Sequence, residues 1–416
     1  MSYQSWRLNE LFKRLHTHWW LSAVAVFAAL QLSIYFPLRQ TRRMLPDAAV
    51  FLLGGDLLAA GYAPYLRLWD VKPPMIYNTT ALFALIAPGD PWTQFYLGSA
   101  LTTIAAVVIV LLAASLTYRL TARPFAAFVT AVLIIGFHNF VQLPSVGIFP
   151  KYFTISFGLA SVWCSLDDRP ALASAFATIA AGYWQWGLIF VMLVYGRAWR
   201  QDRLAHWRPM VFASLCVTII AVMPIVLLGG GVPMIVEVII DVFRLGDHGQ
   251  TLVDRIQKFI RFTGFLWPLL VAGVVGAVET AYRERAHYWL AAGALWPVWQ
   301  IGFVDFDSLA DLHLLLVFAA IGLGVAVGTL RLERHQQIIV VCLVLAFAGG
   351  QLYDMRQVLD TPDDNSVSPD ANSSRGAFID QRIPPESCSI SMGEKMSQLY
   401  SDRPDSRYCG TQVPVG

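Results

Sequence analysis

Long apolar runs, separated by short polar segments, dominate the hydropathy pattern of the chain. Runs of about 18 or more apolar residues are typical of membrane-spanning helices, and Phe95–Tyr118 and Leu309–Val327 are two of them. Hydropathy therefore predicts an all-α polytopic membrane protein with about eleven transmembrane helices. The expected spans lie near 19–38, 95–118, 125–142, 151–166, 171–183, 187–197, 209–229, 263–281, 288–304, 309–328 and 337–353.

Three stretches interrupt this pattern. Residues 39–94 are long and only partly apolar, residues 230–262 have the pattern of surface helices, and residues 354–416 form a polar tail. Long segments of this kind within a compact protein are usually functional or disordered. We therefore predict a transmembrane domain over 1–353, with a long first outer loop at 39–94, followed by an outer tail.

Composition agrees with a membrane protein. The chain has 56% hydrophobic and 14% charged residues, whereas soluble domains average about 25% charged residues. A net charge of +2, without a basic patch interleaved with aromatic residues, argues against nucleic acid as a partner. The first apolar run lacks a small-x-small cleavage site, so we expect it to be retained as a helix.

The distribution of Lys and Arg indicates an orientation. An odd number of spans puts the two termini on opposite sides, and a cytoplasmic N-terminus places fourteen Lys/Arg in inner loops against ten in outer loops before the tail. This favours an outer location, at the cell membrane, for the first loop and for the tail. The outer loops still carry more positive charge than orientation alone explains.

The tail combines a linker with a small cap. Residues 361–374 are a polar, flexible linker by composition, and residues 383–410 contain enough apolar positions to form a small ordered segment. Cys388 and Cys409 are candidates for a disulfide there, which requires that the tail lies on an oxidising side of the membrane. The pairing stays open on the sequence alone.

The first outer loop has the features of a shaped segment along the membrane surface. Residues 47–60 have helical spacing and a mostly apolar face, which favours a helix lying at the interface. Tyr62, Tyr65 and Trp69 supply amphipathic rings of the kind found at headgroup level. Prolines at 64, 73 and 74 stop any helix and fix the path of the chain.

Ionisable residues at a membrane face are costly and are functional candidates. An aspartate can take a proton from an attacking hydroxyl, and Lys or Arg can stabilise a departing phosphate, so this set suits transfer of a group from a phosphate-linked donor. The alternative is that the residues are solvated charges and salt bridges, which is the more frequent case for Asp56. The set comprises Asp47, Asp56, Arg67, Asp70 and Lys72, with Arg39, Arg42 and Arg43 upstream.

The segment PDAAVFLLGGDLLAAGYAPYLRLWDVKPP, residues 46–74, resembles the first outer loop of a known family. This family comprises the multi-spanning, GT-C type glycosyltransferases that use polyprenyl-phosphate sugars, including the protein O-mannosyltransferases and the aminoarabinose transferase of lipid A. The shared order is an acidic residue, a leucine pair, Gly, Pro-Tyr, Trp-Asp and Lys-Pro-Pro. The close match covers about thirty residues, and the remainder of the chain agrees only in its helix pattern.

The resemblance implies roles at the matching positions. Asp47 would be the general base, Lys72 would lie near the donor phosphate with Arg67, and Trp69 and Asp70 would shape the loop over the sugar. Tyr65 and Asp56 belong to the same substrate-facing loop.

The sequence departs from the family in two places. Ala48 stands where many members have a second acidic residue, and Lys151 stands where a carboxylate is frequent. A metal site made of two acids is therefore not indicated, no cofactor is certain, and a divalent cation stays open. Lys151 becomes a candidate for a second phosphate contact.

Polar residues outside the first outer loop have expected roles of their own. His313 occupies a position where family members often carry His or Arg, which implies a contact with the donor headgroup, and Asp311 next to it is expected to cap a helix. Asn139, after His138, is expected to form a hydrogen bond to a neighbouring helix. Residues 184–186 (Trp-Gln-Trp) are predicted to be an interfacial anchor. Arg244, Arg255, Lys258 and Arg261 are expected on surface helices that anionic lipids attract.

The function expected from these residues and the resemblance is transfer of a sugar, by resemblance mannose, from a polyprenyl (dolichyl) phosphate carrier to an outward-facing glycan. The Asp- and Ser-rich linker points to an archaeal surface-glycosylation enzyme. One alternative is a transferase that acts on lipid A or cell-wall glycan. A transporter or lipid flippase belongs to a different class and is disfavoured, because charges gather at one face and few lie at mid-membrane depth.

Overall fold

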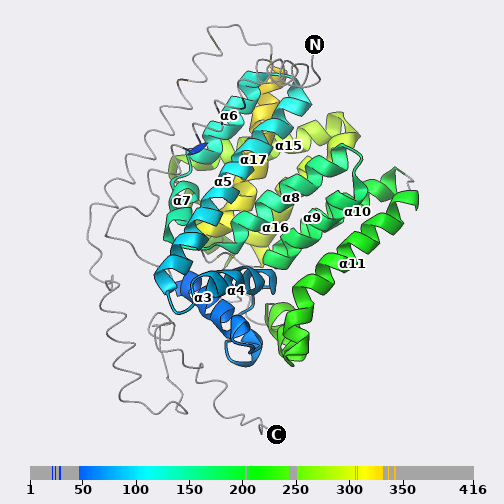
Figure 1. Cartoon of the computed structure of the whole chain (residues 1–416). Coiled ribbons are helices and arrows are strands. Elements are labelled where there is room, and N and C mark those ends of the chain that lie inside the picture. Colours follow the sequence, from blue (N-terminus) through cyan, green and yellow to red (C-terminus); the bar gives the residue numbers. More distant parts are fainter. Residues whose placement is uncertain are drawn as a thin grey trace, which may run out of the picture. The chain divides into compact units, whose positions relative to one another are not determined.

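A computed structural model describes residues 46–201, 204–242, 251–304, 306 and 308–330, together with isolated positions at 21, 24, 28, 29, 336 and 342. Every regular element in these ranges is a helix (Figure 1). The chain divides into two compact units. Unit 1 comprises Met1–Tyr35, Ala106–Val141 and Thr251–Val358, and unit 2 comprises Phe36–Ala105, Gln142–Gln250 and Leu359–Gly416.

The helices lie where the hydropathy pattern predicts them, but most are shorter than a membrane span. Four helical stretches in the described ranges are long and apolar enough to cross a membrane, or up to five if a bent pair counts as one span. The predicted number of eleven is therefore not confirmed, and the expected spans at 19–38 and 337–353 fall almost wholly outside the described residues. The matching helices are α5 (Pro91–Thr121), α8 (Pro150–Leu166), α9 (Pro170–Tyr183), α10 (Leu188–Arg200), α11 (Leu204–Leu227), α15 (Trp267–Arg283), α16 (Tyr288–Phe303) and α17 (Leu312–Thr329).

The span expected at 125–142 is broken. Helix α6 (Pro124–Ile135) ends at Gly136, and the chain then turns by 78° into α7 (His138–Gln142) and the 3-10 turn η2 (Leu143–Val146). The polar residues of α7 consequently leave the axis of α6.

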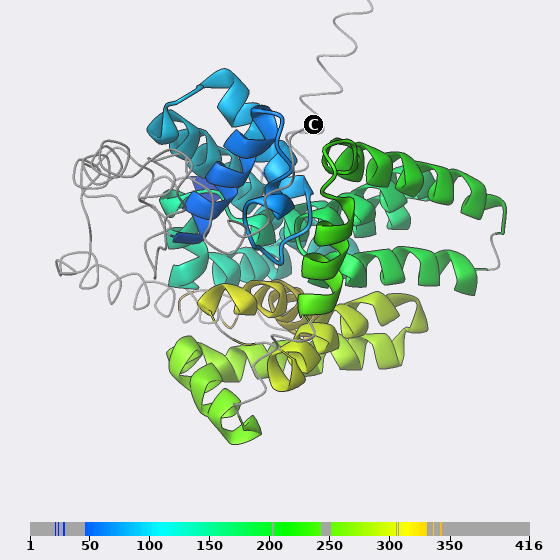
Figure 2. The ribbon, with the colours of Figure 1, turned by 90° about the horizontal axis from the view of Figure 1, so that it is seen from below.

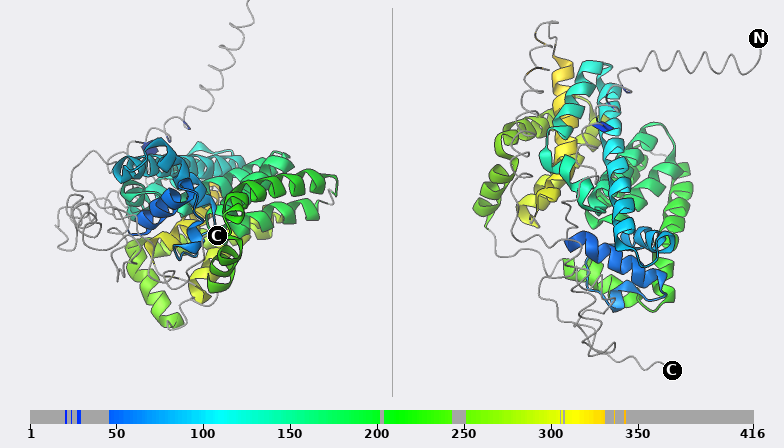
Figure 3. Two further views of the ribbon diagram at one scale, coloured as in Figure 1. Left: turned by 60° about the horizontal axis from the view of Figure 1, so that its bottom comes forward. Right: turned by 60° about the vertical axis from the view of Figure 1, so that its left-hand side comes forward.

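In unit 2, helices α8 to α11 lie side by side (Figures 1 and 3). Helix α3 (Pro46–Ala59) packs on α4 (Met75–Ile86), and α4 contacts α9, below the lower ends of these helices in Figure 1. Close approach of α3 and α4 requires glycine, because a Cβ on Gly54 or Gly55 would overlap Tyr77 or Thr80. Positions 48–55 of α3 are all buried. The helix is therefore enclosed by protein, which differs from the prediction of a helix with one face in the interface.

The region at 230–262 contributes to both units. In unit 2, α12 (Gly231–Ile235) continues into the π-helix η4 (Val236–Asp241). In unit 1, Thr251 and Asp254 form a capping box that starts α14 (Leu252–Thr263). The expected lipid-facing role is wrong for Arg255, which is 4% exposed and donates to the carbonyl oxygen of Ile301. Lys258 likewise donates to the carbonyl oxygen of Phe306, and Arg244 lies outside the described residues.

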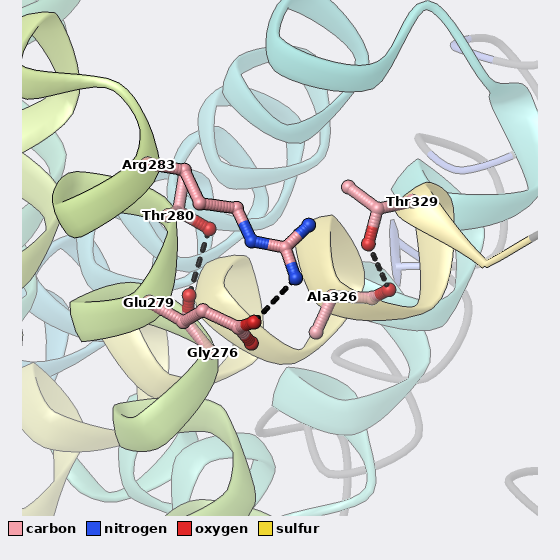
Figure 4. A network of polar contacts seen from close by, with 6 residues as sticks. All are labelled: Gly276, Glu279, Thr280, Arg283, Ala326 and Thr329. Atoms are coloured by element: carbon pink, nitrogen blue, oxygen red, sulfur yellow. Dashed lines mark hydrogen bonds and ion pairs between the residues drawn. The ribbon is translucent and has the colours of Figure 1, made fainter.

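Unit 1 has its core at α15, α16 and α17 (Figure 2). Small residues let α15 and α17 touch backbone to backbone: a Cβ on Gly273 would overlap the carbonyl oxygen of Ala319, and one on Gly322 would overlap that of Gly273. Such contacts are typical of helix pairs in membranes. Near the helix ends, Arg283 pairs with Glu279 at 2.5 Å and Thr280 donates to the Gly276 carbonyl oxygen (Figure 4).

Candidate active site

The residues that carry the resemblance come from α3, from the loop that follows it and from the 3-10 turn η1 (Pro64–Leu66), all in unit 2. Asp47 is exposed in the first turn of α3, where the partial positive charge of a helix N-terminus favours a carboxylate. Lys72 is half-buried. The guanidinium of Arg67 lies 3.8 Å from the ring centroid of Tyr62.

Tyr65 fixes the backbone at Lys72. Its hydroxyl donates to the carbonyl oxygen of Lys72 at 2.6 Å, and its ring meets Tyr77 edge-on with centroids 5.4 Å apart. The prediction of a ring at headgroup level is wrong for Tyr65, because its side chain is fully buried. Burial raises the pKa of the Tyr65 hydroxyl well above its usual range, so it stays a hydrogen-bond donor.

The Trp69-Asp70 pair lies against η4. The backbone N–H of Asp70 donates to Oε2 of Glu237 at 3.0 Å, and the indole N–H of Trp69 reaches Oδ2 of Asp241 at 3.4 Å. On its other side, Asp70 accepts a hydrogen bond of 2.6 Å from the Tyr77 hydroxyl. Burial raises the pKa of Tyr77 well above its usual range and the charge of Asp70 raises it further, which keeps Tyr77 protonated.

A second set of contacts joins the backbone segment before Lys72 to the segment that bears Lys151. The ammonium of Lys151, in the first turn of α8, lies 5.0 Å from the ring centroid of Trp184. The next residue, Gln185, starts the turn η3 (Gln185–Gly187) and donates to the carbonyl oxygen of Val71 at 2.8 Å. Val71 directly precedes Lys72, so the segments that bear the two lysines are tied together.

The same contacts correct the prediction for residues 184–186. Trp184 and Trp186 are 3% and 7% exposed, so the rings are enclosed by protein and the prediction of an interfacial anchor is wrong. Gln185 had no sequence signal of its own. Glu237 had one, since it is a carboxylate in an apolar run, but its partner could not be read from the sequence.

The N-terminal end of α3 lies against the connection that leads into α8. Gly147 has a φ of 135° and passes so close to α3 that a Cβ there would overlap the methyl group of Ala48. Ala48 follows Asp47, and Gly147 precedes Lys151 by four residues. Asp47 and Lys151 therefore stand on segments that contact each other, and Lys72 stands on a segment that is joined to Lys151 through Trp184 and Gln185. One carboxylate and two ammonium groups in such an arrangement suit a base and an anion site.

Asp56 belongs to a structural link. Its Oδ1 accepts a hydrogen bond of 2.9 Å from Gln94 on α5, and the side chain is half-buried. This contact supports the interpretation of Asp56 as a residue that joins two helices. Its place in a substrate-facing loop stays a prediction.

His313, in unit 1, is fully buried. Its Nε2 lies 3.0 Å from Oδ1 of Asn139, and the rings of Phe137 and Phe140 meet it edge-on. The expected hydrogen bond between the polar pair and a neighbouring helix is thereby confirmed for Asn139. A contact of His313 with a donor headgroup stays a prediction, and the buried position offers no surface for it.

Asp311 has the expected capping role. Its Oδ2 accepts the backbone N–H of Ser308 at 2.8 Å, which completes a capping box at the start of the turn η7 (Leu309–Asp311) before α17. Within the described ranges, no group of three or more His, Cys, Asp or Glu side chains could hold a metal ion. The predicted positions Arg39, Arg42, Arg43, Cys388 and Cys409 lie outside the described residues.

Sequence comparisons place the chain among known glycosyltransferases. The model of the DolP-mannose mannosyltransferase family matches residues 61–223, a range that includes Trp69, Lys72, Lys151 and Gln185. A dolichol phosphate-mannose mannosyltransferase of Haloferax volcanii is 29% identical over 307 residues, which cover 72% of this chain and 67% of the relative.

Three solved structures of two membrane enzymes share the fold of this chain. The apo form of ArnT from Cupriavidus metallidurans has a TM-score of 0.58 at 12% identity, over 94% of this chain and 86% of ArnT. The form bound to undecaprenyl phosphate has a TM-score of 0.55, also at 12% identity, over 93% and 85%. The Archaeoglobus fulgidus oligosaccharyltransferase, tethered to an acceptor peptide, has a TM-score of 0.52 at 14% identity, over 93% of this chain and 59% of that enzyme.

The fold and the matches define the class. The chain has the fold of the GT-C type integral membrane glycosyltransferases, and the matches confirm the resemblance to polyprenyl-phosphate-sugar glycosyltransferases that was drawn from residues 46–74. Within this class, the family match and the relative from Haloferax volcanii indicate a mannosyltransferase, which confirms the enzyme prediction.

Proposed function

We propose that this enzyme transfers mannose from a dolichyl-type phosphate carrier to an outward-facing glycan, as in N-glycosylation of surface glycoproteins. The family match and the Haloferax volcanii relative support the donor. The observation that carries the proposal is the contact of Gln185 with Val71, because with Lys151 over Trp184 it ties two lysine-bearing segments together. The excess of Lys and Arg in the expected inner loops supports an active site outside the cell membrane.

In the proposed reaction, Lys72, Lys151 and Arg67 hold the donor phosphate. The bond between the anomeric carbon and the phosphate oxygen breaks, and its electron pair stays on the phosphate, whose negative charge grows. Ammonium and guanidinium groups stabilise this charge more strongly in the transition state than in the ground state, which is the condition for catalysis. A phosphate is a good leaving group, so no general acid is required.

Asp47 is the proposed general base. Its exposed carboxylate takes the proton from the acceptor hydroxyl as the hydroxyl oxygen bonds to the anomeric carbon. The products are the mannosylated acceptor and the polyprenyl phosphate.

The proposal is tested with membranes that contain the wild type or Asp47→Asn, incubated with radiolabelled dolichyl-phosphate mannose. We expect transfer to endogenous lipid and glycoprotein acceptors to fall by about 100-fold or more, the usual size of a general-base contribution. Asp90→Asn is the matched control. Asp90 is exposed and caps α5 by accepting the N–H groups of Trp92 and Thr93, a role that asparagine retains.

Two outcomes would contradict the proposal. Equal transfer by wild type and Asp47→Asn, at equal protein level, would remove Asp47 from the mechanism. Absence of transfer by the wild type, with both dolichyl-phosphate mannose and acceptor present, would remove mannose as the donor sugar.

A further inference from the structure

We propose that Glu237 and Asp241 of η4 are positioning residues that hold residues 69–72 in the orientation required for donor binding. This inference rests on the proposed function of Lys72. Neither residue belongs to the segment that carries the family resemblance, and they lie beyond residues 61–223 of the family match.

The contacts join two short stretches that are far apart in sequence. Glu237 and Asp241 are four residues apart, so they share one face of the helix. They accept hydrogen bonds from consecutive residues of the loop: Glu237 from the backbone N–H of Asp70, and Asp241 from the indole N–H of Trp69. The element is a π-helix, a rare geometry that occurs frequently at functional sites.

Burial indicates that the Glu237 contact is specific. The side chain is 4% exposed, and a carboxylate in that position is costly unless it receives hydrogen bonds. An apolar residue would fill the same space without this cost if packing were the whole requirement. Asp70 is thus held from two directions, through its backbone by Glu237 and through its carboxylate by Tyr77.

The contact of Asp70 is part of a continuous set. Val71 is held through its carbonyl oxygen by Gln185, and Lys72 through its carbonyl oxygen by Tyr65. Polar contacts therefore fix four consecutive positions, and η4 supplies those at the N-terminal end. A displacement of about 1 Å in a positioning element can lower a rate by roughly two orders of magnitude. Replacement of Glu237 should therefore also displace the ammonium group of Lys72, two residues after Asp70.

Hydrogen exchange tests the positioning role directly in the full-length protein in detergent. With overlapping peptides that resolve the Asp70 amide, we expect exchange in Glu237→Ala to be at least about tenfold faster than in the wild type, the effect of losing one hydrogen bond to a charged group. Glu237→Gln keeps an acceptor oxygen and should restore most of the protection. Glu237→Leu, similar in volume and without an acceptor, replaces the alanine variant if that variant does not fold.

Transfer kinetics link positioning to function. We expect kcat/KM for dolichyl-phosphate mannose to fall at least about tenfold in Glu237→Ala and to recover in Glu237→Gln. Glu279→Ala is the control, because Glu279 is exposed on α15 and pairs with Arg283 (Figure 4). Its kinetics and its Asp70 exchange should equal those of the wild type.

The two readouts separate the positioning role from the proposed function. Unchanged exchange of the Asp70 amide in both Glu237→Ala and Glu237→Leu would overturn the positioning role. Faster exchange with unchanged transfer would also overturn it, because the segment would then be loosened without consequence. Faster exchange in a protein whose wild type transfers no mannose would instead reject the proposed function and leave the hydrogen-bond role of Glu237 supported.

Discussion

The two units hold their segments together by different kinds of contact. In unit 1, glycines let α15 and α17 touch through their backbones, as at Gly273 and Gly322. In unit 2, polar side chains connect loops across long sequence separations, as Gln185 does with Val71 and Glu237 with Asp70. Backbone contacts hold two helices close together without using polar side chains. Polar contacts to the carbonyl and amide groups of a loop instead hold the loop in place and thereby orient its charged side chains. The candidate site accordingly lies where loops are held by polar groups.

The largest effect is expected from breaking the helix contact of unit 1. Gly322→Val places side-chain atoms against the Gly273 carbonyl oxygen and the backbone of Ala277, which cannot move aside. We expect a loss of about 3 kcal/mol in the free energy of unfolding, measured by thermal unfolding in detergent.

Gly302→Ala is the control for this variant. A Cβ there meets no atom within 4 Å, and Gly302 lies inside α16. Alanine should leave the protein unchanged or more stable by about 0.5–1 kcal/mol. Equal losses in both variants would mean that the close contact of α15 and α17 does not stabilise the unit.

The next effect concerns the lysines of unit 2. Lys72→Met and Lys151→Met should each lower kcat/KM by roughly 10- to 100-fold, because each removes a charge-assisted contact with phosphate. If both lysines bind one phosphate, the double variant should lose less than the product of the two single losses.

Arg285→Met serves as the control for the lysine variants, since Arg285 is exposed on the turn η6 (Arg285–His287). Fully independent losses at Lys72 and Lys151 would argue for two separate anion contacts. The measurement is initial-rate kinetics with dolichyl-phosphate mannose as the varied substrate.

The smallest effect is expected at a polar contact of unit 1, in which Asn139 of α7 pairs with His313 of α17. Asn139→Ala leaves the buried His313 ring without this partner and should cost about 1–2 kcal/mol of unfolding free energy. Asn139→Ala and His313→Leu should be non-additive in stability, while mannose transfer per folded molecule stays unchanged. A loss of transfer in His313→Leu without a loss of stability would instead support the predicted donor role of His313.

Part of this organisation could be predicted from sequence. Apolar runs of defined length predicted the positions of the helices from α5 to α17, because apolar residues on consecutive turns have few other stable arrangements in lipid. The capping role of Asp311 and the hydrogen bond of Asn139 were also predictable, since a helix N-terminus and a polar group in an apolar helix both demand a partner.

The contacts that assemble the candidate site were not predictable. Trp184 and Tyr65 have the amphipathic rings of interfacial residues, yet both are buried, because the direction of a side chain depends on neighbours far away in the sequence. Gln185 and Glu237 reach residues more than a hundred positions away. The periodic spacing of apolar residues identifies helices but carries no information about such long-range pairings. The number of membrane spans stays unconfirmed for a related reason, since hydropathy finds apolar helices without fixing whether each one crosses the bilayer.

The lengths of α9 and α10 have a consequence for the surrounding lipid. With 14 and 13 residues at about 1.5 Å per residue, they are about 21 and 20 Å long, against a hydrocarbon core of about 30 Å. Apolar side chains such as Leu172 and Met192 are exposed on them. A bilayer adapts to short hydrophobic helices by thinning locally. A bilayer that these two helices cross would therefore be thinner beside them than beside the longer helices α5 and α11.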